Sequence, residues 1–143
     1  MSKTSPDLNR SGFLLWKASN AWQRQVKTAL APAGITHVQF LLLETLDALP
    51  ADKKVSSQAE IARLAGIDVM MTSKVMRLLV RKKLVERRSP RNDARAFAVV
   101  LTPAGKKLLA KARPLVEKNE DVFFAEIEKR KKFVANLESL TAE

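Results

Sequence analysis

Hydrogen-bond donors and apolar side chains lie close together between residues 70 and 77. Lys74 and Arg77 can donate to the acceptors on guanine or to phosphate oxygens, and the Ser73 hydroxyl can serve either role. Met70 and Met71 precede them, and such side chains can pack against thymine methyl groups. This mixture favours contact with base pairs in the major groove of DNA. The alternative is that the methionines belong to the core and Arg77 is a solvated surface charge.

A second basic segment follows a short distance along the chain. Arg87, Arg88, Arg91 and Arg95 lie around the pair Asn92 and Asp93. Guanidinium groups bind phosphates and are attracted into narrow minor grooves. An ion pair between Asp93 and Arg95 would stiffen this segment, although an exposed pair contributes under about 1 kcal/mol. The alternative is an ordinary surface loop.

The elements that must position the first cluster form a predicted helix-turn-helix. Ser57 and Glu60 have the spacing of a capping box at the start of a short helix of about eight residues. Gly66 favours the left-handed conformation that ends a helix, and Asp68 can cap the next one, over about 69–82. The cluster therefore lies on the second helix of the pair, which is the one that reads bases in this motif.

The rest of the chain predicts a mostly helical protein with a small β-hairpin. Segments 84–88 and 97–101 are rich in β-compatible residues and are joined by a turn. Apolar residues at helical spacing indicate three further helices. The first covers about 10–31, the second begins at a capping box at Thr36, and the third covers 102–143, where Pro114 should bend the chain. This order is typical of a winged helix-turn-helix, which we expect at about 35–101. We expect the whole chain, 1–143, to form a single unit.

The flanking helices, 10–31 and 102–143, carry more apolar residues than a small domain needs for its own core. Burial between two subunits would cover this surface, and we expect a homodimer; the alternative is a bundle within one chain. The residues expected at the dimer interface are Leu14, Leu15, Phe123, Phe133, Leu137 and Leu140.

Composition agrees with a polyanionic partner. The 143 residues include 26 Lys and Arg against 15 Asp and Glu, for a formal charge of +11, and no cysteine. Neutralising phosphates releases counterions, so such a chain gains affinity for any DNA duplex. The absence of cysteine excludes disulfides and thiolate metal sites. No signal peptide and no stretch of roughly 18 apolar residues is present, and we expect a cytoplasmic protein.

No pattern of catalytic residues is present. The chain lacks a glycine-rich phosphate loop and a nucleophile elbow, and its single histidine does not make a metal site. We therefore expect no enzyme, no metal and no cofactor. Trp16, His37 and Phe40 could stack on a small aromatic effector, although such residues also occur in cores and interfaces. The alternative function is that of an architectural or nucleoid-associated protein that binds DNA without reading sequence.

Four short strings resemble the MarR-type transcriptional regulators. They are Gly34-Ile-Thr-His-Val-Gln-Phe, Ala59-Glu-Ile-Ala, Asp93-Ala-Arg95 and Leu101-Thr-Pro-Ala-Gly105, and the resemblance covers about residues 10–140. It implies a homodimer that binds a pseudo-palindromic DNA site and is often released by a small phenolic or aromatic ligand. One departure is Lys83, where relatives usually have glycine, so the turn into the wing is expected to differ.

The resemblance and the residue patterns together predict a sequence-specific regulator, and we expect a repressor. The residues expected to contact DNA are Ser57, Met70, Met71, Thr72, Ser73, Lys74, Arg77, Arg81, Arg88, Arg91, Asn92 and Arg95.

Overall fold

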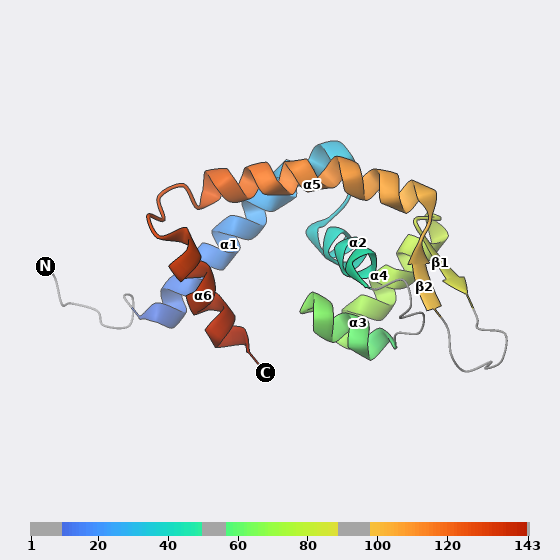
Figure 1. Ribbon diagram of the computed structural model, residues 1–143, viewed down its shortest axis with the longest axis horizontal. Helices are drawn as coiled ribbons and strands as arrows, with labels where there is room; N and C mark the ends of the chain where they lie inside the picture. Colours follow the sequence, from blue (N-terminus) through green and yellow to red (C-terminus); the bar gives the residue numbers. More distant parts are fainter. Residues whose placement is uncertain (1–9, 50–56, 89–97, 143) are drawn as a thin grey trace, which may run out of the picture. The chain divides into compact units, whose positions relative to one another are not determined.

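The computed structural model describes residues 10–49, 57–88 and 98–142, and it divides into two compact units. Unit 1 consists of residues 1–29 with 115–143, and unit 2 of residues 30–114. The described elements, drawn in Figure 1, are α1 (Ser11–Leu30), a 3-10 turn (Ala31–Ala33), α2 (His37–Ala48), α3 (Gln58–Ala65), α4 (Val69–Arg81), β1 (Val85–Arg88), β2 (Ala98–Leu101), α5 (Pro103–Phe123) and α6 (Arg130–Thr141). This is the mostly helical fold with a small hairpin that the sequence predicts.

Side-chain caps set the starts of the helices in unit 2. The Thr36 hydroxyl accepts the Gln39 backbone N–H at 3.1 Å, and the Gln39 side chain accepts the Thr36 N–H at 3.2 Å, which completes the predicted capping box of α2. At α3, the Ser57 hydroxyl accepts the Glu60 N–H at 3.1 Å. At α4, Asp68 Oδ1 accepts the Met71 N–H at 2.8 Å. These caps satisfy backbone donors that have no partner within the helix.

The core of unit 2 is built around α2, which packs against α3, α4 and β2. Buried leucines of α2 meet apolar residues from each neighbour, and this burial is the main favourable term that holds the helix-turn-helix together. The largest fully buried side chains of unit 2 are Leu30, Leu42, Leu43, Ile61, Thr72, Met76, Leu79, Val85 and Leu109.

The hairpin and the start of α5 meet at one hydroxyl group. Strands β1 and β2 pair antiparallel, with Val85 opposite Leu101 and Arg88 opposite Ala98. Next to this pairing, the Thr102 hydroxyl accepts the Gly105 N–H at 3.0 Å and donates to the Lys83 carbonyl at 2.7 Å. Thr102 therefore caps α5 and also links it to the turn that follows α4.

Lys83 lies in that turn with φ of +61°, in the left-handed region. It is the one described residue other than glycine with a positive φ. The turn therefore takes a backbone conformation that glycine adopts without steric cost and that a residue with a Cβ rarely adopts. A residue with a Cβ in this conformation costs about 1–2 kcal/mol.

Replacing Lys83 with glycine is expected to raise the free energy of unfolding by about 0.5–1 kcal/mol, because the relieved strain exceeds the entropy that glycine adds to the unfolded chain. Chemical denaturation measures this change. Lys82→Gly is the matched control, since Lys82 has φ of −79° and its replacement should not stabilise the protein. A Lys83→Gly protein no more stable than the parent would contradict the prediction.

Unit 1 contains α1, the second part of α5 and α6. Phe124 lies edge-on to Phe123 at 4.9 Å between ring centroids and 5.6 Å from Phe133, which belongs to α6. The Arg130 guanidinium lies 4.9 Å from the centre of the Phe124 ring and 3.9 Å from Glu120 Oε2. These contacts hold α6 beside the end of α5.

Unit 1 nevertheless leaves much apolar surface exposed. Of the residues predicted at a dimer interface, Leu14, Leu15 and Leu140 are exposed, whereas Phe123, Phe133 and Leu137 are half-buried. Further exposed apolar side chains of this unit are Trp16, Val122, Ile127 and Val134.

Within the described ranges, no single helix combines the length and the apolar character needed to cross a bilayer, and only α1 and α2 taken together, as a bent pair, meet that test by length and composition.

Candidate nucleic-acid interface

The two faces of α4 carry different kinds of side chain. Thr72, Met76 and Leu79 recur at helical spacing and are fully buried. On the opposite side, Met70, Lys74, Arg77 and Arg81 recur at the same spacing and are all exposed. We call these four residues the exposed stripe. No acidic residue interrupts α4, so the stripe presents cations and one long apolar side chain to any partner.

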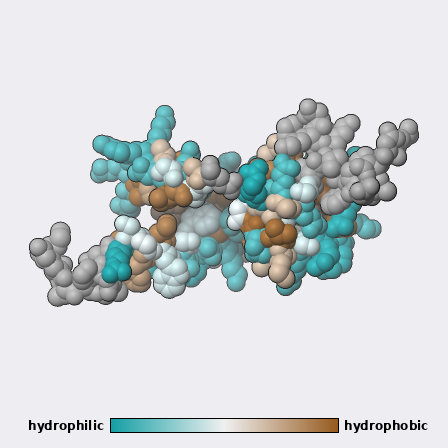
Figure 2. Space-filling model, turned by 90° about the horizontal axis from the view of Figure 1, so that it is seen from below, coloured by the Kyte–Doolittle hydropathy of each residue, from teal (hydrophilic) through white to brown (hydrophobic). Residues whose placement is uncertain are grey.

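The first turn of α4 adds apolar surface beside these cations. Leu64 near the end of α3 and Val69, Met70 and Met71 at the start of α4 are the large hydrophobic residues of the described part of unit 2 that are exposed. We call them the apolar patch. In the space-filling view, hydrophobic residues reach the surface among hydrophilic ones (Figure 2). Exposed apolar groups beside cations suit the major groove, where base edges and thymine methyl groups form the floor and phosphates lie along the two sides.

These positions decide between the alternatives for several predicted contacts. Met70 and Met71 are exposed and are not core residues, whereas Met76 is. The prediction that Thr72 contacts DNA is wrong, because its side chain is fully buried on the core face of α4. Ser73 is half-buried beside the exposed stripe. Ser57 is exposed at the start of α3, where its oxygen accepts the Glu60 N–H.

The described part of the wing is basic and exposed. Arg87 and Arg88 lie on β1 with exposed side chains, and Arg88 forms an ion pair with Glu86 at 3.2 Å between nitrogen and oxygen. Both partners of this pair face water, so it contributes under about 1 kcal/mol. The other predicted wing residues, Arg91, Asn92, Asp93 and Arg95, lie outside the described residues, and so does the expected Asp93–Arg95 ion pair.

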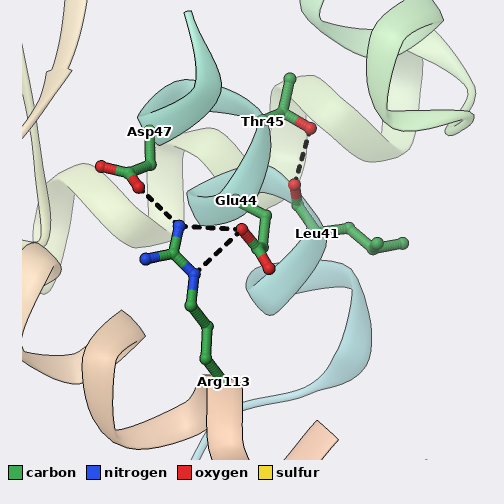
Figure 3. A network of polar contacts seen from close by, with 5 residues as sticks. All are labelled: Leu41, Glu44, Thr45, Asp47 and Arg113. Carbon is green, nitrogen blue, oxygen red and sulfur yellow. Dashed lines mark hydrogen bonds and ion pairs between the residues drawn. The ribbon is translucent and has the colours of Figure 1, made fainter. Parts of the chain in front are cut away.

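A polar network fixes the first part of α5 against α2 (Figure 3). Arg113 donates to Glu44 Oε2 from Nε at 3.2 Å and from Nη2 at 3.0 Å, and Nη2 also bonds to Asp47. These hydrogen bonds raise the pKa of Arg113 above its ordinary value. Glu44 and Asp47 lie one turn apart on α2, so both carboxylates reach the same guanidinium. The Arg113 side chain therefore joins α2, which packs against α4, to α5, which follows the wing.

The three residues considered for an aromatic effector are in different settings. His37 stacks on Phe40 with 6.5 Å between ring centroids, and burial lowers the pKa of His37. Phe40 is buried in the core of unit 2. Trp16 belongs to unit 1, where it is exposed and stacks with Phe13 at 6.2 Å. In the described ranges, no group of His, Cys, Asp and Glu side chains gathers in a way that could hold a metal ion.

Comparison with known proteins identifies the family of this chain. The model of the MarR family matches residues 33–96, which include α2, α3 and α4. The HTH-type transcriptional regulator YdcH of Bacillus subtilis is 37% identical over 97% of this chain and 95% of its own length. The chain belongs to the MarR family. MarR proteins are regulators of transcription that bind DNA, and this chain is therefore a DNA-binding regulator of that type.

Two further MarR relatives have names that state their ligands or role. The transcriptional repressor Rv2887 of Mycobacterium tuberculosis is 30% identical over 73% of each chain. Its structure in complex with salicylic acid covers 95% of this chain and 99% of its own, with a TM-score of 0.73 and 26% identity. The structure of MepR of Staphylococcus aureus in complex with DNA aligns with 92% of this chain and 96% of the MepR chain, with a TM-score of 0.79 and 25% identity.

The MarR fold also accounts for a feature that the sequence reasoning missed. Arg113 lies 66 and 69 positions from its two acidic partners. The only local signal is the spacing of Glu44 and Asp47, which places both carboxylates on one face of α2. Nothing in the sequence near Arg113 indicates which basic residue lies opposite them.

Proposed function

We propose that this MarR protein is a homodimeric repressor that binds a pseudo-palindromic operator, with α4 of each subunit in a major groove. The observation that carries the proposal is the exposed stripe of Met70, Lys74, Arg77 and Arg81 opposite a fully buried face. Side chains at this spacing lie along one side of a helix, as recognition by a helix in the groove requires. Lys74 and Arg77, next to the half-buried Ser73, are the proposed base or phosphate contacts.

The wing is proposed to contact the DNA backbone. Arg87 and Arg88 are exposed cations on β1 and support this proposal from the described residues. Arg91, Asn92 and Arg95 stay proposed contacts from sequence, with Asp93 and Arg95 proposed to stiffen the wing. Phosphate contacts add affinity without sequence preference and make binding sensitive to salt. The wing and α4 would therefore supply different parts of the binding free energy.

The proposed dimer uses the apolar surface of unit 1. Exposed leucines at positions 14, 15 and 140 support an interface made by α1 and α6, together with Phe123, Phe133 and Leu137. In this proposal, 10–31 and 102–143 supply the dimerisation helices, and about 35–101 supplies the DNA-binding region. Sedimentation should show a dimer, and a Leu15→Lys/Leu140→Lys protein should sediment as a monomer.

Release by a small aromatic ligand is proposed by analogy with Rv2887, whose structure holds salicylic acid. The proposed ligand residues here are Trp16, His37 and Phe40. Salicylate should weaken binding of this protein to its operator. A salicylate titration that leaves the affinity of this protein for its operator unchanged would remove this part of the proposal.

A competition experiment separates a sequence-specific regulator from an architectural protein. Genomic fragments selected by the purified protein supply the candidate operator, which is labelled and challenged with an excess of random duplex at fixed salt concentration. Specific sites are bound roughly 10³–10⁷ times more tightly than random DNA, so the labelled complex should persist. Equal competition by random duplex and by unlabelled operator would favour the architectural alternative.

A further inference from the structure

The methionines of the described chain have sharply different exposures. Met70 is 84% exposed and Met71 40% exposed in the first turn of α4, whereas Met76 is fully buried only a few positions later in the same helix. The protein contains no cysteine. Thiol oxidation is therefore unavailable to this protein, and thioethers are the sulfur groups that an oxidant can reach.

The reaction of such a thioether with a peroxide is simple and balanced. A sulfur lone pair attacks one oxygen of hydrogen peroxide, an S–O bond forms and the O–O bond breaks. The departing hydroxide takes up the proton of the oxygen now bound to sulfur and leaves as water. Sulfur is oxidised by two electrons to the sulfoxide, and the peroxide is reduced by two electrons. Methionine sulfoxide reductases reduce the sulfoxide back to the thioether, so the modification is reversible.

We propose that Met70, followed by Met71, is an oxidation site through which peroxides weaken DNA binding by this protein. The proposal rests on the proposed function, because it requires that the first turn of α4 faces the DNA. There, Met70 belongs both to the exposed stripe and to the apolar patch. Oxidation replaces an apolar, flexible end with a polar S=O group that only accepts hydrogen bonds.

That change is unfavourable at this particular surface. The neighbouring cations Lys74 and Arg77 indicate an anionic partner, and an added acceptor oxygen competes with the phosphates and base acceptors of that partner for the N–H donors of these two side chains. A polar group buried against a thymine methyl group without a partner also loses its hydration. The helix itself should stay folded, because the Asp68 carboxylate accepts the backbone N–H of Met71 and not a group of its side chain. Thr72, Met76 and Leu79 also stay buried in the core.

The first test maps oxidation without using DNA binding. The full-length protein is treated with hydrogen peroxide, and peptide mass spectrometry follows each methionine over time. We expect Met70 to be oxidised first, Met71 next and Met76 last, with the circular dichroism of the protein unchanged. Oxidation of Met76 at the rate of Met70, or resistance of Met70, would overturn the proposal whether or not the protein binds DNA.

The second test measures the consequence on the selected operator. Oxidised protein should bind about tenfold more weakly for each subunit, or about a hundredfold for the dimer, as expected for one unpaired polar group in each subunit. Treatment with methionine sulfoxide reductases should restore the affinity. Met76→Leu protein should keep this response. Met70→Leu/Met71→Leu protein, compared with itself before and after peroxide, should lose it.

The outcomes distinguish the two proposals. If the untreated protein does not discriminate its operator, the proposed function fails. If it does discriminate, but Met70-oxidised protein binds with unchanged affinity, the oxidation proposal fails alone. A loss of affinity that the reductases do not reverse, or that persists in the doubly substituted protein, assigns the effect to another residue and also overturns it.

Discussion

Gly105→Ala is expected to lower the free energy of unfolding by about 3 kcal/mol and the melting temperature by about 10 °C. A Cβ at Gly105 would overlap the backbone carbonyl oxygen of Leu84. The obstacle is main chain and not the end of a flexible side chain, so either the start of α5 or the turn before β1 must move. That movement would also disturb the bonds of Thr102 to Lys83 and Gly105, which join these two segments. Thermal and chemical denaturation measure the loss.

Gly12→Ala is the matched control for this experiment. Gly12 lies in α1, where a Cβ added to the glycine would have no neighbour within 4 Å. Alanine is favoured over glycine within helices, so this protein should be more stable by about 0.5 kcal/mol. If Gly105→Ala behaved like Gly12→Ala, the close approach of α5 to Leu84 would not exist in solution.

Arg77→Ala is expected to cost about 1–3 kcal/mol of operator binding in each subunit and to relax the preference for one base pair. Arg77 lies in the middle of the exposed stripe, opposite the core face, so its removal should leave the fold intact. Alanine also suits a helix interior. Fluorescence anisotropy with the operator and with single-base variants, at one salt concentration, measures affinity and discrimination together.

The matched control is Lys118→Ala, which removes one exposed positive charge from unit 1. It should change operator affinity only slightly and should leave base discrimination as it was. Should Arg77→Ala weaken operator and mutated operator alike, Arg77 would be a phosphate contact. Should it change neither, Arg77 would have no place in the interface.

The helix starts and the fold class could be predicted because their causes are local. A cap depends on a side chain and a backbone N–H three residues on, and Thr36, Ser57 and Asp68 each form that bond. The hairpin followed from β-compatible residues on either side of a turn. Helical spacing alone also places Lys74 and Arg77 on the opposite side of α4 from Thr72, Met76 and Leu79.

Other features could not be predicted because they depend on distant packing or on backbone conformation. The bonds from Arg113 to Glu44 and Asp47 join residues far apart in sequence. Thr72 is a different case, because its helical spacing with Met76 and Leu79 already indicates the core face of α4, where its side chain is fully buried. Lys83 takes the left-handed conformation at the end of α4, where the Leu84 N–H bonds to the Leu79 carbonyl and the Lys83 N–H bonds to the Val80 carbonyl, and its own Cβ disfavours this conformation.

The separation of α4 into two stripes bears on how operator preference can change during evolution. Thr72, Met76 and Leu79 supply the packing, and Asp68 supplies the cap. Residues 70, 74 and 77 lie on the opposite side and contribute little to folding. New side chains at these three positions can therefore be tried without risking the scaffold, and a duplicated copy could acquire a different target site in few mutational steps. The same freedom makes these positions the natural ones to randomise in selecting regulators for chosen DNA sequences.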